Sequence, residues 1–156
     1  MIRENPDRPL FTYIHIMDPH DPYISAKAKH HLPDPPDESA IRPIVKKRES
    51  GILNLNPYRT ELLPLTDDEK SYLRAAYRAE IRQVDMLLQQ FLLARSQTEG
   101  GLEDLLVIIT SDHGEEFGEH GYYQHGMSLF ESSIRVPLIM IHPEHIQGNR
   151  ICKETV

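Results

Sequence analysis

The chain has 156 residues, of which 39% are hydrophobic and 26% charged, as is typical of one globular domain. Its 24 acidic residues outnumber the 17 Lys and Arg residues, the formal net charge is −7, and no basic block is present. This balance argues against nucleic acid as a partner. A single cysteine, Cys152, excludes a disulfide framework within one chain.

No apolar run approaches the roughly 20 residues that a bilayer-spanning helix needs, and the first ten residues (MIRENPDRPL) are polar. We therefore expect neither a transmembrane segment nor a signal peptide in this chain. The compartment of the parent protein, whether periplasmic, extracellular or cytoplasmic, is left open.

The first expected element is a strand at residues 11–16 (FTYIHI), which is rich in β-branched and aromatic residues. A turn with the sequence DPHDP closes it at residues 18–22. Residues 24–65 then hold six of the twelve prolines and show little periodicity. We interpret them as a long excursion within a single partial domain that spans residues 1–156.

A helix is predicted to begin after Thr66, because Thr66 and Glu69 have the spacing of a capping box. Apolar residues then recur at spacings of three and four, which predicts one stripe packed in the core. The stripe comprises Leu73, Tyr77, Ile81, Val84, Leu88 and Phe91. The pair Gly100-Gly101 bounds this segment.

Two further strands are expected at residues 105–110 (LLVIIT) and 136–141 (VPLIMI). Continuous apolar runs of this length are typical of parallel strands buried on both faces. The order of strand, crossover helix and strand predicts an α/β fold.

Asp112 and His113 directly follow the expected strand 105–110, where ligands bind in open parallel sheets. Asp112 offers a hard oxygen ligand and His113 a nitrogen, and Gly114 would let the backbone turn sharply so that both face one cation. The alternative is a simple turn in which Asp112 bonds nearby amides and His113 lies on the surface.

Three segments occur in order with a helix between them: HIMDPHDPY (15–23), TSDHGEEFGEHG (110–121) and HGMSLFESSIRVPLI (125–139). Together they resemble the later part of a bacterial sulfatase, a family of the alkaline phosphatase superfamily. The resemblance covers residues 11 to about 143. It implies part of a three-layer sandwich with a mainly parallel sheet.

The resemblance also implies roles for individual residues. Asp112 matches the residue that binds the divalent cation, and His113 matches the next residue, which binds the cation or contacts the substrate. Calcium is favoured as the cation, with manganese or zinc as alternatives. His20 matches a residue that contacts the sulfate or leaving group, as a proton-donating imidazole can. His125 stands where many sulfatases have a Lys, and an imidazole can still donate to an ester oxygen. His120 is a further candidate for substrate binding.

Other polar residues are interpreted as structural. His15 alternates into the first strand and is expected to be a hydrogen-bonded core or interface residue. Glu131 and Arg135 are expected to pair near the last strand. Asp67 and Asp68 suit the first turn of the helix, where the helix dipole favours acidic residues.

The family's nucleophile, a formylglycine made in a Cys/Ser-x-Pro-x-Arg motif, has no counterpart here. None of the residues two positions before a proline is Cys, Ser or Thr, and Cys152 lies after all the motifs. An earlier pair of metal-binding Asp residues is also missing. We therefore expect a truncated piece of a larger enzyme, which lacks the other part of its own domain, or a chain that pairs with another polypeptide.

The sequence supports three hypotheses. The first is a piece of a sulfuric ester hydrolase that acts on sulfate esters. The second keeps the superfamily but makes the parent a phosphodiesterase, a phosphonate monoester hydrolase or a phosphoglycerol transferase acting on phosphate esters. The third is a non-catalytic interaction module.

Overall fold

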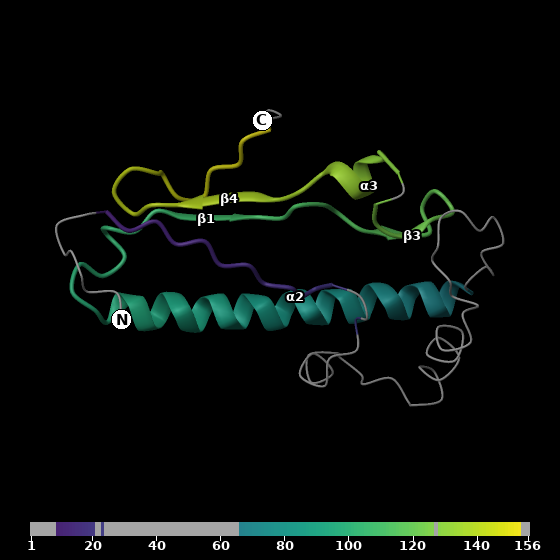
Figure 1. Ribbon diagram of the computed structural model, residues 1–156, viewed down its shortest axis with the longest axis horizontal. Helices are drawn as coiled ribbons and strands as arrows, with labels where there is room; N and C mark the ends of the chain where they lie inside the picture. Colours follow the sequence, from purple (N-terminus) through teal and green to yellow (C-terminus); the bar gives the residue numbers. More distant parts are fainter. Residues whose placement is uncertain (1–8, 21–22, 24–65, 127, 154–156) are drawn as a thin grey trace.

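The computed structural model describes residues 9–20, 23, 66–126 and 128–153. Its elements in chain order are α2 (Asp67–Ser96), β1 (Val107–Thr110), β2 (Glu116–Phe117), β3 (Tyr123–Gln124), α3 (Glu131–Ile134) and β4 (Leu138–Ile141). Helix α2 runs beneath the β1–β4 pair, with α3 and β3 toward one end (Figure 1). The predicted excursion at residues 24–65 falls outside the described residues.

The start of α2 confirms the predicted capping box. The Glu69 amide donates to Thr66 Oγ1 at 3.2 Å, and the Thr66 amide donates to Glu69 Oε2 at 2.8 Å. These two bonds satisfy backbone donors that a helix start leaves without intrahelical partners. The helix ends at Ser96, and Gly100 and Gly101 follow with φ of +76° and +49°, a backbone region that favours glycine.

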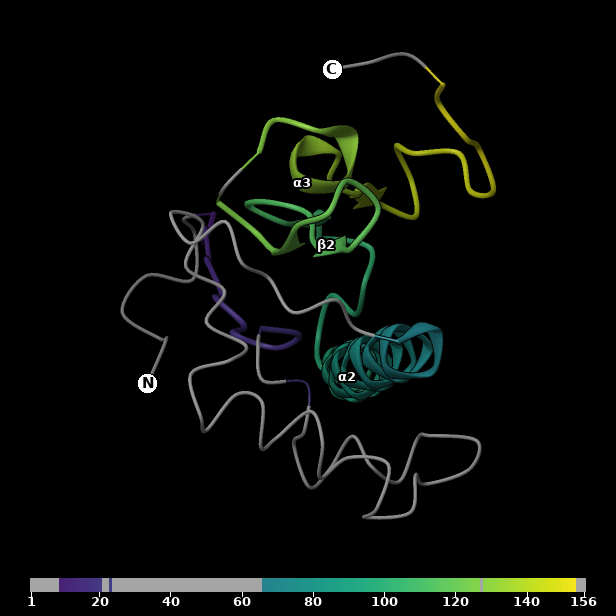
Figure 2. The same cartoon turned by 90° about the vertical axis from the view of Figure 1, so that its right-hand side faces the viewer.

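A small core forms where α2 meets the β2 region. Buried Ala76 packs with Tyr23 and Phe117, and three partly buried residues surround them: Tyr72, Leu73 and Tyr77. The first part of the predicted apolar stripe is therefore packed. Further along, Val84 and Leu88 are partly buried, but Ile81 and Phe91 are 44% and 47% exposed, so the prediction holds there only in part. Viewed down α2, the β2 region and α3 lie across from the helix (Figure 2).

Strands β1 and β4 pair antiparallel, with Val107 opposite Ile141 and Thr110 opposite Leu138. Strands β2 and β3 also pair antiparallel. The expected strands at 105–110 and 136–141 are thus present in shorter form, but the described pairs do not have the parallel arrangement predicted for them. The reason is connectivity: the chain leaves β1 and returns to β4 at the same end, whereas a parallel pair needs a crossover.

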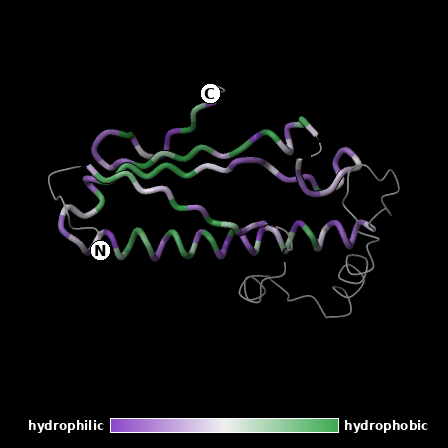
Figure 3. Tube along the Cα trace, in the orientation of Figure 1, coloured by the Kyte–Doolittle hydropathy of each residue, from purple (hydrophilic) through white to green (hydrophobic). Residues whose placement is uncertain are grey.

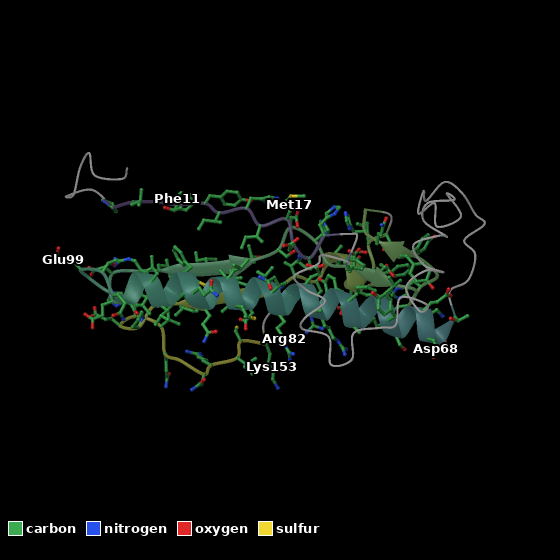
Figure 4. The ribbon with its side chains drawn as sticks, turned by 90° about the horizontal axis from the view of Figure 1, so that it is seen from below. Phe11, Met17, Asp68, Arg82, Glu99 and Lys153 are labelled. Atoms are coloured by element: carbon green, nitrogen blue, oxygen red, sulfur yellow. The ribbon has the colours of Figure 1, made fainter. Side chains whose placement is uncertain are left out.

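Residues 11–16 form no strand in the described structure, so that prediction is wrong here. The segment runs along one flank of the molecule from Phe11 to Met17, while the chain near Lys153 lies on the other flank (Figure 4). Phe11, Tyr13 and Ile14 are exposed. An extended segment becomes a strand only when a neighbour supplies ladder hydrogen bonds.

Much of the apolar surface of the described residues is exposed. Hydrophobic residues concentrate along β1 and β4 (Figure 3), and all four residues of β4 are exposed. Among the described helices, none combines the length and apolar character that a membrane span requires.

Candidate active site

The loop after β1 carries the Asp112-His113 pair. The Ser111 hydroxyl donates to the His113 carbonyl at 2.7 Å, and the His113 amide donates to Asp112 Oδ1 at 3.1 Å. Asp112 therefore bonds a nearby amide, as the simple-turn alternative expected. Its side chain is nonetheless 75% exposed, so its oxygens can be reached from outside.

The hydrogen bond of His113 determines its tautomer. Its Nδ1 lies 2.8 Å from the Gly114 carbonyl, which can only accept, so Nδ1 carries the proton. In the neutral ring Nε2 then keeps a free lone pair, the state required of a metal ligand. Nε2 lies 3.7 Å from Asp112 Oδ1. The two atoms are close enough to contact one cation.

Gly114 has a different role from the one predicted. The φ of Gly114 is not positive, so a left-handed backbone conformation is not the reason for a glycine here. A Cβ at Gly114 would lie 2.0 Å from the Ser132 carbonyl oxygen, and the Gly114 amide donates to the Ser133 carbonyl at 2.7 Å. Close approach to the backbone of α3 explains the glycine.

Three predicted site histidines converge at this loop. The rings of His113 and His125 stack with centroids 3.8 Å apart and planes inclined by 25°. His20 meets the His125 ring edge-on at 5.3 Å. The turn before His20 is closed by its amide, which donates to the Met17 carbonyl at 2.9 Å. The structure thus brings His20, His113 and His125 together beside Asp112.

Glu115 is a residue of this site that sequence reasoning missed. Its side chain is only 5% exposed, and its carboxylate accepts from His125 Nδ1 at 3.2 Å and from the Tyr23 hydroxyl at 2.5 Å. Burial first, and then the charge of Glu115, raise the pKa of neighbouring Tyr77. No local sequence signal pointed to Glu115, because its two partners, His125 and Tyr23, lie 10 and 92 residues away along the chain.

His120 does not join the histidine cluster through its described contacts. Its Nδ1 donates to Glu116 Oε2 at 3.2 Å, and its ring stacks on Phe130 at 3.8 Å. Glu116, only 1% exposed, also accepts from the hydroxyls of Ser128 at 2.6 Å and Ser133 at 3.4 Å. These bonds tie β2 to the loop around residue 128 and to α3.

The carboxyl groups of Asp112 and Glu116 both have pKa values below their usual ones, although their surroundings differ. Desolvation on its own raises the pKa of Asp112, but backbone hydrogen bonds and then His113 and His15 together hold it below its usual value. Desolvation likewise raises the pKa of Glu116. Hydrogen bonds from several donors, Ser128 and His120 foremost, outweigh it and lower the pKa overall. Both carboxylates are therefore ionised at neutral pH.

The residues expected to be structural show mixed outcomes. Glu131 and Arg135 pair at 3.8 Å on the surface, as predicted. His15 is hydrogen-bonded, as expected, to Tyr13 at 3.3 Å and to the Met17 sulfur at 3.2 Å. It is exposed, so a core position is wrong, while an interface position stays a prediction. Within the described residues, no group of three or more His, Cys, Asp or Glu residues could hold a metal ion.

The family model described as Sulfatase matches residues 1–155. The chain therefore has the α/β fold class of the alkaline phosphatase superfamily. It belongs to the sulfatase family, whose members generally use a divalent cation and a formylglycine.

Curated relatives agree with this assignment. The chain is 29% identical to a choline-sulfatase of Rhizobium meliloti over 149 residues, covering 90% of this chain and 28% of that protein. It is 25% identical to an arylsulfatase of Clostridium perfringens, covering 92% of this chain and 30% of that protein. It is 38% identical to arylsulfatase K of Mus musculus over 78 residues, covering 50% of this chain and 14% of that protein. No solved structure matches.

Proposed function

We propose that this chain supplies part of the active site of a hydrolase that cleaves sulfate esters. The observation that carries the proposal is the convergence of His20, His113 and His125 beside Asp112. Membership of the sulfatase family and the likeness to an arylsulfatase and a choline-sulfatase support sulfate esters as the substrate class. Because the chain spans only 14% to 30% of the length of these relatives, the activity belongs to the whole protein.

Asp112 and His113 would hold a divalent cation, with calcium favoured and manganese or zinc as alternatives. The donors fit such an ion, because one is an ionised carboxylate and the other a ring whose Nε2 lone pair is free. A bound cation would stabilise negative charge on the oxygens of the ester group. Two side chains fill only part of a coordination shell. We therefore expect further ligands from outside the described residues.

The remaining histidines would act on the substrate. The Nδ1 proton of His125 is directed to Glu115, so Nε2 is the nitrogen left to face the ester. His20, at the edge of the His125 ring, would contact the sulfate or the leaving group and donate a hydrogen bond. His120 was also expected to bind substrate, but its contacts with Glu116 and Phe130 favour a role in supporting the loop.

The formylglycine of the family finds no matching residue in this chain, and we derive no step through it. We place it in a segment of the parent protein that this sequence does not include. The same segment would add the strands that complete a three-layer sandwich with a mainly parallel sheet. The exposed apolar residues of β1 and β4 support this placement, since buried strands of such sheets are apolar on both faces.

Hydrolysis of an aryl sulfate by the complete parent protein tests the proposal. Asp112→Ala and His113→Ala should each lower kcat/KM by about 10³-fold or more, because a cation contributes several kcal/mol to charge stabilisation. Asp85→Ala, an exposed carboxylate change on α2, is the matched control and should leave the rate within about twofold.

Two outcomes would overturn the assignment. Faster turnover of an aryl phosphodiester than of the aryl sulfate would place the parent among the phosphate-ester enzymes of the superfamily. A folded parent protein that turned over neither ester would instead favour a non-catalytic interaction module.

A further inference from the structure

We propose that Glu115 is a positioning residue that holds the His125 ring in its working orientation and tautomer. This inference rests on the proposed function, in which His125 acts on the ester. No motif match assigns a role to Glu115; its role follows from the contacts of its side chain.

The carboxylate of Glu115 is held in place by its partners. Glu115 is 5% exposed at its side chain, and each of its two oxygens has a different partner: Oε2 accepts from Tyr23 and Oε1 from His125. A buried carboxylate with both oxygens engaged has little freedom to rotate. Its position is therefore determined by the core, because the Tyr23 ring packs edge-on to Tyr77 at 5.5 Å and lies 5.9 Å from Phe117.

The bond to Glu115 selects the tautomer of the His125 imidazole. A carboxylate oxygen accepts hydrogen bonds, so the bond between Glu115 Oε1 and His125 Nδ1 places the proton on Nδ1. The bond thereby selects one neutral tautomer and leaves Nε2 available to the substrate. Partners of this type fix the ring orientation of metal-binding and catalytic histidines, and their loss typically costs about 10- to 100-fold in activity.

The orientation of the His125 ring also affects its two histidine neighbours. His125 is stacked on His113 and meets His20 at its edge, so a rotation of its ring would disturb both contacts. Glu115 thus links the hydrophobic core to the histidine cluster through a single side chain. The competing explanation is that Glu115 merely satisfies the Tyr23 hydroxyl, in which case His125 would be indifferent to its loss.

The first experiment measures the ring directly in the 156-residue chain. Nitrogen-15 NMR of the imidazoles, recorded at a pH where the His125 ring is neutral and with His125 assigned by its disappearance in His125→Asn, should show the proton on Nδ1. Glu115→Met is similar in size and removes the acceptor, so the proton should shift toward Nε2 or distribute over both nitrogens. Tyr23→Phe removes the other partner of Glu115 but leaves the acceptor for His125 Nδ1 present, so the proton of His125 should stay on Nδ1.

Glu131→Met is the matched control, since Glu131 is an exposed carboxylate in the same part of the chain, and it should leave the His125 signals unchanged. If Glu115→Met fails to fold, Glu115→Leu, which also removes the acceptor, serves instead. Native signals for His125 in a folded Glu115 variant would overturn the proposal.

The second experiment is a double-mutant cycle on aryl sulfate hydrolysis by the parent protein. Glu115→Met should lower kcat about 10- to 100-fold with a smaller change in KM, because it misorients a group that acts on the ester. In the His125→Asn background the same change should cost less than about twofold, since its target is gone. An equal loss in both backgrounds would overturn the positioning role. Absence of turnover in the unsubstituted parent would count against the proposed function alone, because the NMR experiment tests Glu115 without activity.

Discussion

At the scale of single residues, Gly114 joins the site to α3. A Cβ at this position would lie 2.0 Å from the Ser132 carbonyl oxygen and 3.3 Å from that of Arg135, and both are backbone atoms that cannot swing away. Gly114→Ala should therefore force the loop and α3 apart. We expect a loss of about 1–3 kcal/mol in the free energy of unfolding, measured by urea denaturation.

Gly148→Ala is the matched control for this prediction, because a Cβ at Gly148 meets nothing within 4 Å and its φ is not positive. It should leave the urea midpoint unchanged or raise it slightly, since alanine lowers the entropy of the unfolded chain. Equal midpoints for the two variants would show that α3 does not press on Gly114.

Sequence reasoning at this scale selected the candidate site residues but not the residue that supports them. Asp112, His113, His20 and His125 were selected by residue type and by position after strands or in motifs. Glu115 was missed because its value lies in contacts with Tyr23 and His125, which are 92 and 10 residues away along the chain. No local pattern encodes that contact.

At the scale of elements, Glu116 connects β2, the loop around residue 128 and α3. Hydrogen bonds lower its pKa in the folded protein below the ordinary value of 4.5, although desolvation opposes them. A lowered folded pKa means that this stability is fully present above pH 4.5 and is lost as the pH falls through the folded pKa. The free energy of unfolding of the wild type should therefore decrease as the pH is lowered below 4.5.

Glu116→Gln removes the titrating group, so its free energy of unfolding should change less over the same acidic range than that of the wild type. Urea denaturation at a series of pH values measures the slope. Glu131→Gln is the control, because Glu131 is exposed and should leave the wild-type slope in place. Parallel curves for wild type and Glu116→Gln would contradict the stabilising role of these bonds.

At this scale, the sequence could predict the start of a helix but not the pairing of the strands. The start of α2 was predictable because Thr66 and Glu69 are three residues apart and their bonds are local. Strand pairing was not, because the apolar run of β1 is compatible with either direction of its neighbour. The pairing of β1 with β4 depends on the path of the 27 residues between them.

At the scale of the whole molecule, the described chain buries little apolar surface. Its buried hydrophobic residues are Tyr23, Ala76, Ala79 and Phe117, whereas the apolar side chains of β4 are 40% to 49% exposed. Apolar surface of this kind, on strands with free edges, is typical of a face that contacts another chain segment. The likeness to longer relatives supports the rest of the sulfatase domain as that segment.

This incompleteness leads to a prediction about activity. The purified 156-residue chain should show no turnover of an aryl sulfate above a matched control protein, even with calcium, manganese or zinc supplied. The reason is that the proposed reaction needs an activated nucleophile and a fully ligated cation, and this chain offers two proposed cation ligands and no nucleophile motif. Calorimetry should accordingly detect only weak cation binding that Asp112→Ala abolishes.

Joining the chain to the remaining part of its domain should create activity. That activity should be lost on replacing the Cys or Ser of the added nucleophile motif and on Asp112→Ala or His113→Ala. It should fall by about 10² to 10⁴ on His20→Ala or His125→Ala, because one hydrogen-bonding imidazole typically contributes that much. Asp85→Ala again serves as the control. Robust turnover by the 156-residue chain alone, unaffected by changes at Asp112 and His113, would contradict both the need for a second segment and the location of the site.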